Sequence, residues 1–260
     1  MKQIQIYKEI LLSHKRCTRY GINKSITFPL VRLKGNELYI RLKRNEKLID
    51  IFCSCINGIK SQIKNDYIFL LIDCEGYLLD IKCNKKIYNC LDEQNFKVGM
   101  SFSEGSLGTN AISMAMKIKK TVYLKPNEHY CEILKKWYCI ATPLLIDNME
   151  IIGYIDISTI EKSIADEMIL VIELLKDKII SEYNKKELGR SIFNINLTDK
   201  QLEILRMCAQ GYKELSISIE LGIEVATVKY HKKQIIKKLH VKNIQEAIAK
   251  ATKLEVISVD

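Results

Sequence analysis

The chain has 260 residues, of which 47% are apolar, and this composition supports a sizeable core in one to three domains. It contains no run of 18 apolar residues and no apolar signal segment at its N-terminus, which argues against a membrane span and against export. The net charge of +10 is uneven, because residues 1–64 carry a net +10, residues 65–195 a net −3 and residues 196–260 a net +3. Basic ends around a nearly neutral middle are typical of a sensor region joined to a nucleic-acid-binding end, and a merely solvated basic N-terminus is an equal alternative.

The nine cysteines are odd in number and irregularly spaced. We therefore expect reduced thiols in the cytoplasm, with no bound metal and no other cofactor. Cys53 and Cys55 are either a redox or metal pair or two small residues on a helix. The apolar residues on both sides of them, including Phe52 and Ile56, favour the helix.

From Tyr67 onward the pattern is typical of β-strands and short helices. The expected strands are residues 67–73, 77–81, 121–124, 139–146 and 151–158, and residues 110–118 are expected to form a helix. The turns of the two hairpins fall at residues 74–76 and 147–150. Antiparallel hairpins mixed with helices predict an α+β fold in which helices flank one sheet.

A glycine-containing loop precedes the helix at residues 110–118. Gly99, Gly105 and Gly108 lie before Thr109 and Asn110, so the loop either cradles an anion or leads tightly into a capped helix. We favour the second reading, in which Thr109 or Asn110 caps the helix.

Two further positions carry chemistry. Glu128-His129-Tyr130 either supplies a metal ligand or places a hydrogen-bonded structural histidine, and we favour the second reading because no further ligands occur at metal-binding spacing. Cys139, close to Trp137 on an expected strand, is the thiol of greatest interest, although buried cysteines are usually inert.

A larger set of spaced residues resembles a known sensor domain. The set comprises Gly99, Ser103-Glu104, Gly108-Thr109-Asn110-Ala111-Ile112, Glu128-His129-Tyr130, Trp137, Cys139, Ala141, Pro143, Asp147, Gly153 and Asp156-Ile157-Ser158. It resembles the GAF sensor domain of the acetoin and glycerol regulators (AcoR and DhaR type). Ser13, Arg16-Cys17 and Gly21 extend the likeness upstream, with His14 where those sensors have Trp.

This resemblance implies a pocket for a small organic ligand with hydroxyl or carbonyl groups. The candidate ligand-binding residues are Thr109, Asn110, His129, Tyr130, Trp137 and Cys139. The regulators that carry this sensor continue with an AAA+ ATPase and work with the alternative sigma factor RpoN. No Gly-x4-Gly-Lys-Ser/Thr loop occurs in this chain, so we expect it to act at ordinary promoters, by recruiting or blocking RNA polymerase.

An amphipathic helix is expected over residues 161–183, followed by a linker at residues 185–190. Its apolar stripe recurs at steps of three and four residues and consists of Ile164, Met168, Val171, Ile172, Leu175 and Ile179. The stripe packs either on the protein's own sheet or against the same helix of a second subunit, and the pattern favours neither.

The last 60 residues predict several short helices, one of them strongly basic. Residues 227–240 contain five lysines and no acid. Val228, Ile235 and Leu239 share one face of this helix, and lysines occupy the other face. A short helix, a turn at Gly222 and a helix with one apolar and one basic face outline a helix-turn-helix, whereas a solvated lysine face is the alternative from charge alone.

The full pattern resembles the LuxR-type helix-turn-helix of bacterial transcription regulators. The matching positions are Leu197-Thr198, Gly211, Ile217, Leu221-Gly222-Ile223, Thr227-Val228-Lys229, His231, Ile235, Lys238-Leu239, Val241, Glu246-Ala247 and Ala251. The resemblance implies that Lys229, Tyr230 and Lys233 enter the major groove of double-stranded DNA, and that Thr227, Lys232 and Lys237 contact phosphates. It also implies a cap at Thr198, a scaffold helix over residues 213–221 and a recognition helix over residues 226–239.

The chain departs from the family pattern at the scaffold helix and around it. Gln201 stands where the family usually has Glu, and Glu224 where a Ser commonly caps the recognition helix. The common Asn-Lys-Glu run reads Glu214-Leu215-Ser216. Glu214 and Glu224 repel phosphate, which weakens the expected anchoring of the scaffold helix on the DNA backbone.

We therefore expect an α+β, GAF-like sensor with a helical N-terminal extension over residues 1–160, a connecting segment over residues 161–190, and an all-α, four-helix LuxR-type domain over residues 196–260. The expected function is that of a cytoplasmic, ligand-responsive transcription regulator, acting as a homodimer and not as an enzyme. The rival interpretation is a GAF-fold thiol enzyme of the methionine sulfoxide reductase kind, and a third is a sensor without ligand that serves only to form dimers.

Overall fold

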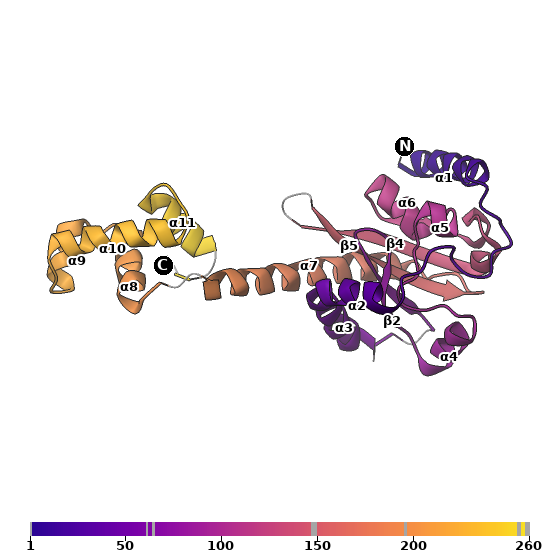
Figure 1. Cartoon of the computed structure of the whole chain (residues 1–260), viewed down its shortest axis with the longest axis horizontal. Helices are drawn as coiled ribbons and strands as arrows, with labels where there is room; N and C mark the ends of the chain where they lie inside the picture. Colours follow the sequence, from indigo (N-terminus) through magenta and orange to yellow (C-terminus); the bar gives the residue numbers. More distant parts are fainter. Residues whose placement is uncertain are drawn as a thin grey trace. The chain divides into compact units, whose positions relative to one another are not determined.

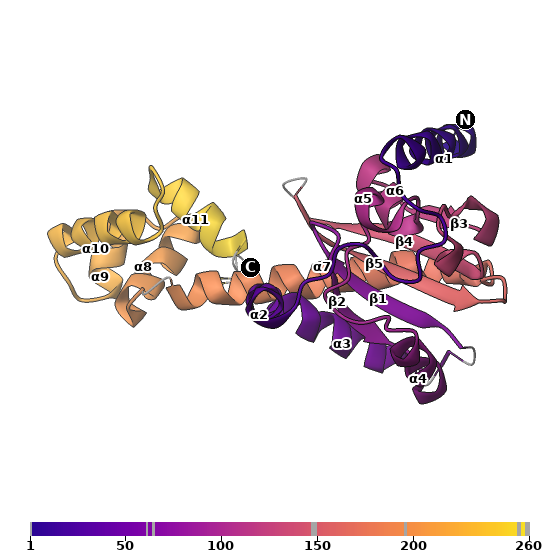
Figure 2. The same ribbon diagram turned by 45° about the vertical axis from the view of Figure 1, so that its right-hand side comes forward.

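The computed structural model describes residues 2–60, 62–63, 66–146, 150–194, 197–253 and 256–257 (Figures 1 and 2). It contains two compact units, Met1–Tyr183 and Asn184–Asp260. Among the described residues, no helix has the length and apolar content needed to cross a membrane.

The first unit is an antiparallel sheet with helices on both faces. Its strands are β1 (Ile68–Asp73), β2 (Leu78–Lys82), β3 (Val122–Leu124), β4 (Trp137–Leu145) and β5 (Ile151–Ile160), in the order β2-β1-β5-β4-β3. Its helices are α1 (Lys2–Arg19), α2 (Gly35–Arg44), α3 (Glu46–Lys60), α4 (Lys85–Glu93), α5 (Glu104–Leu107) and α6 (Ala111–Ile118), with short 3-10 turns at Pro126–Glu128 and Glu132–Leu134. All strand pairs are antiparallel, which confirms the expected α+β arrangement.

The sheet is buried on both faces, which explains why β1 is buried along its whole length and apolar from Ile68 to Ile72. Because side chains alternate along a strand, Leu70 of β1 packs into the core under α6, whereas Phe69 and Leu71 pack into the opposite core under α3. Figure 1 shows α1, α5 and α6 on one side of the sheet and α2, α3 and α7 (Glu167–Asn194) on the other.

The apolar stripe of α7 belongs to the core beneath the sheet. Ile164, Met168, Ile172, Leu175 and Ile179 are each at most 7% exposed and cluster with residues of α3, β1 and β5. Packing on the protein's own sheet, one of the two expected alternatives, is therefore confirmed, and pairing of this same stripe with a second subunit is wrong. Among the side chains of α7 that the structure describes, Ile169, Leu170 and Leu174 are exposed apolar ones.

The boundaries of the connecting segment also differ from expectation. The helix begins at Glu167 instead of residue 161, and it continues to Asn194, so residues 185–190 are helical and not a linker. Lysine and glutamate are good helix formers and one glycine is tolerated, which explains this continuation. Of the expected turn at residues 147–150, residues 147–149 lie outside the described part of the chain.

The second unit contains four short helices around a small core, as expected. They are α8 (Asp199–Ala209), α9 (Glu214–Glu220), α10 (Val225–Lys238) and α11 (Ile244–Lys253). Thr198 caps α8, since its hydroxyl accepts a hydrogen bond from the amide of Gln201 at 3.3 Å and the Gln201 side chain accepts from the amide of Thr198 at 3.1 Å. Gly222, with φ of 60°, forms the turn between α9 and α10.

Candidate ligand cavity and nucleic-acid interface

A closed cavity lies between α6 and the sheet in the first unit. The volume that the centre of a water molecule can occupy in this cavity is about 10 Å³. This is room for roughly one water. The residues that line it are Leu70, Phe102, Asn110, Ala111, Ile112, His129, Leu134, Trp137, Cys139, Asp156 and Ser158. The cavity is therefore small and polar at several points, within an otherwise apolar core.

Asp156 and Ser158 contribute the polar wall on the sheet side. They are two residues apart on β5, so both face α6, and in the register of the sheet they lie opposite Ala141 and Cys139 of β4. The Ser158 hydroxyl donates to Oδ1 of Asp156, while Oδ2 has no hydrogen-bond partner within the described residues. Burial raises the pKa of Asp156 to about 7, so its neutral form is well populated near neutral pH.

His129 contributes the polar wall on the opposite side. Its ring is fully buried, and neither ring nitrogen makes a hydrogen bond of normal geometry within the described part of the chain, although the Trp137 backbone lies close by. Burial lowers the pKa of His129 to about 3, so the ring is neutral at physiological pH. The expectation of a structural histidine stays a prediction, and the ring lines the cavity beside Asp156.

Four of the six expected ligand-binding residues line the cavity: Asn110, His129, Trp137 and Cys139. Asn110 also caps α6, because its side chain accepts a hydrogen bond from the Ser113 amide at 2.9 Å. This geometry confirms the cap in place of an anion-binding loop. Trp137 stacks on Phe96 with ring centroids 5.3 Å apart, which fixes one end of the cavity.

The other two expected residues, Thr109 and Tyr130, are buried but turn away from the cavity toward α1. The Thr109 hydroxyl lies 2.7 Å from the Ser13 hydroxyl, and the Tyr130 hydroxyl lies 3.3 Å from that of Thr18. The loop that carries Thr109 and Asn110 therefore has one side on the cavity and the other under α1.

Asp156 and Ser158 were absent from the expected ligand-binding set. The available signal was a pair of polar residues at spacing two that alternate with Ile155 and Ile157. Such a pair on a strand that is buried on both faces points to a polar site inside the core.

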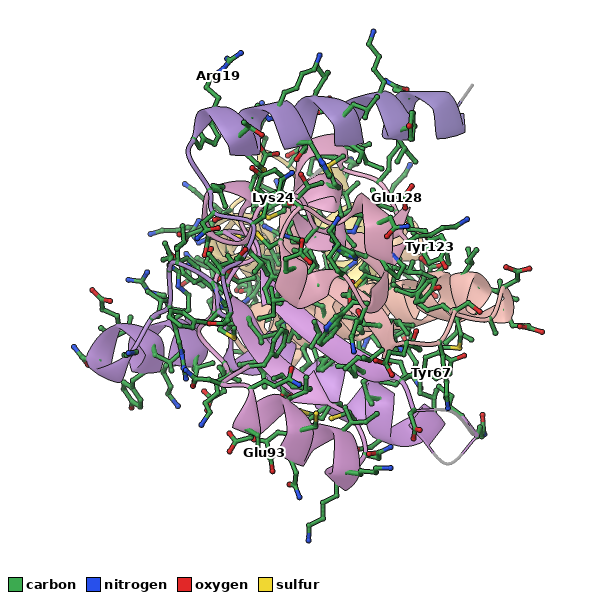
Figure 3. All side chains as sticks on the ribbon, turned by 90° about the vertical axis from the view of Figure 1, so that its right-hand side faces the viewer. Arg19, Lys24, Tyr67, Glu93, Tyr123 and Glu128 are labelled. Carbon is green, nitrogen blue, oxygen red and sulfur yellow. The ribbon has the colours of Figure 1, made fainter. Side chains whose placement is uncertain are left out.

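A polar network holds α1 over this loop. Ser13 donates to the Glu104 carboxylate at 2.7 Å, and Arg16 forms two hydrogen bonds to the same carboxylate at 2.7 and 2.8 Å. His14 Nε2 lies 2.9 Å from the Glu128 carbonyl, and Figure 3 shows Glu128 beneath α1. The upstream motif residues Ser13 and Arg16 thus meet the loop motif residue Glu104 in the folded chain.

Burial works against activation of the thiols in the core. Burial raises the pKa of Cys139 well above its ordinary value and that of Cys131 to about 11. Cys53 and Cys55 lie on α3, as the helical reading predicted, and burial raises the pKa of each. Within the described residues, no group of three or more His, Cys, Asp or Glu side chains is arranged to hold a metal ion.

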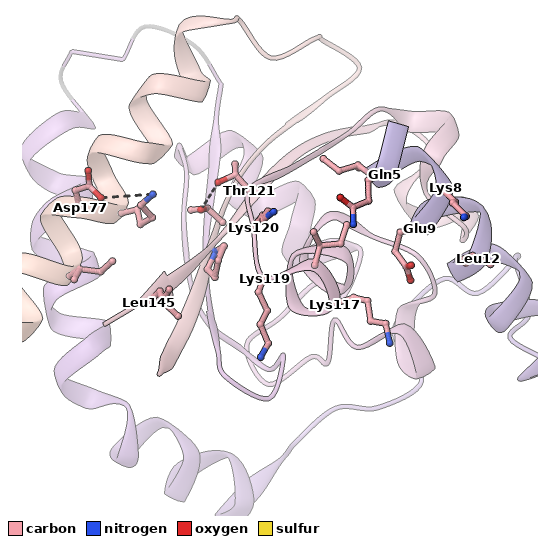
Figure 4. A pocket seen from close by; sticks show the side chains of 16 residues that line it. Gln5, Lys8, Glu9, Leu12, Lys117, Lys119, Lys120, Thr121, Leu145 and Asp177 are labelled. Carbon is pink, nitrogen blue, oxygen red and sulfur yellow. Dashed lines mark hydrogen bonds and ion pairs between the residues drawn. The ribbon is translucent and has the colours of Figure 1, made fainter. Parts of the chain in front are cut away.

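A second, open hollow of about 1090 Å³ lies between α1, the end of α6 and α7 (Figure 4). Lys8, Lys117 and Lys119 are among the residues around it. None of the described side chains that line it has a buried polar atom without a partner, in contrast to the cavity beside Asp156. The closed cavity is therefore the better candidate for a ligand site.

In the second unit, α10 presents one buried and one basic face. Val228, Ile235 and the adjoining Leu239 are at most 1% exposed in the core, while Lys229 and Lys233 are exposed. The other expected DNA-binding side chains also lie on or beside the outer face: Thr227, Tyr230, Lys232 and Lys237. Tyr230 is 58% exposed, and its ring lies edge-on to that of His231 at 5.5 Å.

Two of the expected DNA-binding lysines face an acid. Lys232 Nζ lies 2.8 Å from one oxygen of Glu214, and Lys229 Nζ lies 4.0 Å from the other. The N-cap of α10 is Glu224, and its side chain makes no capping hydrogen bond, in keeping with its departure from the family pattern.

Comparison with known proteins agrees with this geometry. The family model described as bacterial regulatory proteins, luxR family, matches residues 195–251. The C-terminal unit is a LuxR-type DNA-binding domain. The predicted resemblance is confirmed, and the acid-free helix α10, which follows the Gly222 turn, lies within the matched residues.

Two curated regulators are similar over a longer stretch. The signal-transduction and transcriptional-control protein of Clostridium beijerinckii is 26% identical over 154 residues, which cover 58% of this chain and 24% of that protein. The acetoin dehydrogenase operon transcriptional activator AcoR of Bacillus subtilis is 26% identical over 159 residues, which cover 61% of this chain and 26% of AcoR. The chain thus matches about a quarter of the length of these relatives.

The fold of the first unit has a solved counterpart. The N-terminal part of Escherichia coli DhaR, in a crystal structure of its complex with DhaL, superposes with a TM-score of 0.61 over 72% of this chain and 65% of that chain, at 16% identity. This likeness confirms the expected GAF-like fold class next to the LuxR-type domain.

Proposed function

We propose that this protein is a ligand-responsive transcription regulator. The observation that carries the proposal is the LuxR-type unit whose helix α10 exposes lysines and no acid. In this proposal, Lys229, Tyr230 and Lys233 reach base edges in the major groove, and Thr227 and Lys237 contact phosphates.

The cavity beside Asp156 is the proposed ligand site. Both His129 and Asp156 have neutral forms near neutral pH, so the site favours an uncharged molecule. A ligand that both donates and accepts hydrogen bonds would suit the polar atoms that line the site. These atoms are the two ring nitrogens of His129 and Oδ2 of Asp156. A compact hydroxylated or carbonyl compound has this chemistry, and its binding would require the cavity to enlarge.

The second proposed partner is another copy of the chain. A single LuxR-type domain offers few base contacts, so useful affinity requires two half-sites read by linked subunits. The exposed Leu174 of α7 lines a largely apolar hollow of about 340 Å³ together with Ile59, Ile63 and Val171, and Leu170 is exposed on the same helix. This surface suits the same surface of a second copy.

The remaining proposals concern enzymatic activity, the cellular compartment and the mode of action at promoters. The raised pKa values of the buried thiols support a regulator without enzymatic activity, because thiolates are the reactive form of cysteine. We place the protein in the cytoplasm, where the chromosome lies, and infer that it recruits or blocks RNA polymerase at ordinary promoters.

The DNA-binding proposal is tested by footprinting on an operator selected from random duplexes with the full chain. Lys229→Ala with Lys233→Ala should weaken binding at least about tenfold, since a good base contact is worth about 1–3 kcal/mol. Lys242→Ala, an exposed lysine outside α10, is the matched control. A full footprint by the double variant would refute the assignment of α10 as the reader.

The ligand proposal is tested by thermal unfolding of the full chain with a panel of uncharged hydroxy and carbonyl compounds and their carboxylate counterparts. An uncharged compound should raise the Tm. Cys139→Met, which fills the cavity, should abolish this shift, and Cys90→Met at an exposed position should retain it. A shift that survives Cys139→Met places the ligand elsewhere.

A further inference from the structure

The carboxylate of Glu214 lies between the two helices of the DNA-reading pair. Glu214 is the first residue of α9, and its two oxygens face Lys232 at 2.8 Å and Lys229 at 4.0 Å on α10. The side chain of Lys229 is 65% exposed, that of Glu214 33% and that of Lys232 22%. One acid therefore lies within ion-pair distance of two of the five lysines on the basic stretch of α10.

The two lysines differ in how strongly they are held. The hydrogen bond to Glu214 holds the Lys232 amine toward α9 and away from solvent. The same hydrogen bond is the main cause of the lowered pKa of Glu214. Lys229 is at the edge of ion-pair distance and keeps most of its surface free. Lys232 is thus engaged within the protein, whereas Lys229 remains available to DNA with its field reduced by the nearby acid.

Stabilisation of the fold accounts poorly for this arrangement, because a partly exposed ion pair adds little to stability. We expect the Glu214–lysine arrangement to have a larger effect on the affinity for DNA than on the stability of the fold. Sequence-independent affinity comes from lysine contacts to phosphates, each of which releases counterions, and an acid on the same surface both neutralises a lysine and repels phosphate.

We propose that Glu214 is a specificity-determining residue that limits nonspecific attraction to DNA. It withdraws Lys232 from phosphate binding and weakens Lys229, so that stable binding depends on base contacts. The inference rests on the proposed DNA-binding function, and it assigns Lys232 to positioning within the helix pair instead of to phosphate contact.

The test compares Glu214→Gln with Glu220→Gln in the full chain. Glu220 is an exposed acid on the same helix, and no ion pair to it is seen among the described residues, so its substitution removes the same charge without releasing a lysine. Binding is measured by fluorescence anisotropy on a labelled random-sequence duplex of about 30 base pairs and on the selected operator, at several salt concentrations.

Glu214→Gln should bind the random duplex at least about threefold more tightly, with a log–log salt slope steeper by about 0.9 for each additional phosphate that a lysine neutralises. The ratio of operator to random-duplex affinity should fall. Glu220→Gln should change the slope by less than half as much. Equal effects of the two substitutions, or unchanged random-duplex affinity in Glu214→Gln, would overturn the inference.

Lys232→Met supplies an independent arm. In the wild-type background it should leave the salt slope unchanged, because Lys232 makes no phosphate contact there. Added to Glu214→Gln, it should return the slope to its wild-type value. A flattened slope on Lys232→Met in the wild-type background would contradict the assigned positioning role. If the wild-type chain shows no salt-dependent binding to either duplex, the proposed function itself fails, which is a different result from a wild-type binder that Glu214→Gln leaves unaltered.

Discussion

The Ser158 hydroxyl donates a hydrogen bond to one carboxyl oxygen of Asp156, and the other oxygen faces the cavity without a partner among the described residues. This half-satisfied carboxyl is fully buried, and apart from Ser158 its neighbours on the same face of the strand, Tyr154 and Ile160, belong to the apolar core. An apolar residue of similar size would fill the position at lower cost, since a buried polar group without its bonds destabilises a fold. The pair therefore marks a site that a ligand or water completes.

Asp156→Asn should make the stability of the sensor unit less dependent on pH. The folded-state pKa of about 7 is raised above the ordinary 3.8, so the protonated carboxyl contributes stability that is fully present below about pH 4 and is lost as pH rises through 7. The difference in unfolding free energy, wild type minus variant, should fall by about 2–3 kcal/mol between pH 5 and pH 8. Urea unfolding followed through the fluorescence of Trp137, the single tryptophan, measures it.

His129 does not obscure this comparison, because it titrates in both proteins. Its pKa is lowered to about 3, so its own contribution is lost in the opposite direction, as pH falls below its ordinary 6.5. Asp166→Asn, at an exposed position, is the control and should give a difference that is nearly constant with pH. A constant difference for Asp156→Asn as well would show that this carboxyl is ionised in the folded protein.

The sheet was predictable because its signals are local. The apolar run at residues 67–73 became β1, and the polar break at residues 74–76 became the turn before β2, within one residue of the expected boundaries. The caps at Thr198 and Asn110 were predictable for the same reason, since each depends on a side chain and an amide three residues apart.

The cavity was only partly predictable, because its walls come from four distant segments. Asn110, His129, Trp137 and Cys139 were expected from the resemblance. The local pattern did not show that Thr109 faces α1 or that Asp156 lines the same cavity as His129. The partner of the α7 stripe was equally hidden, since a period of three and four residues reports an apolar face and not what covers it. The structure places that face on the protein's own sheet.

Gly108→Ala should destabilise the sensor unit by about 2–4 kcal/mol, combining the left-handed backbone penalty with overpacking. Gly108 has φ of +65°, and a Cβ there would lie 2.9 Å from Cβ of Tyr130. Gly105→Ala is the matched control, because no atom lies within 4 Å of its Cβ position and the residue is helical in α5. Urea unfolding distinguishes the two, and equal costs would contradict the close approach of Tyr130 to the loop.

Glu104→Gln should loosen α1 from the loop beside the cavity. The carboxylate accepts from Ser13 once and from Arg16 twice, and the partly buried guanidinium would lose its main counter-charge. We expect a loss of about 1–2 kcal/mol in unfolding free energy and faster proteolysis within α1. Glu9→Gln removes one weaker-held partner of the same Arg16 and should cost less than half as much. Unchanged proteolysis in Glu104→Gln would show that α1 is held by its apolar contacts alone.

The exposed and buried leucines of α7 allow the proposed interface between subunits to be tested separately from the core. Leu170 and Leu174 are 63% and 60% exposed, whereas Leu175 is 4% exposed in the core beneath the sheet. Leu175→Asp should therefore unfold the sensor unit, since an unpaired buried carboxylate costs several kcal/mol. Leu170→Asp with Leu174→Asp should leave the unit folded, but place like charges in the proposed seam between two copies. Sedimentation should then report a monomer, and affinity for a two-half-site operator should fall at least about 100-fold as the linkage between half-sites is lost. A folded double variant that remains dimeric and binds its operator normally would place the contact between subunits on another surface of the chain.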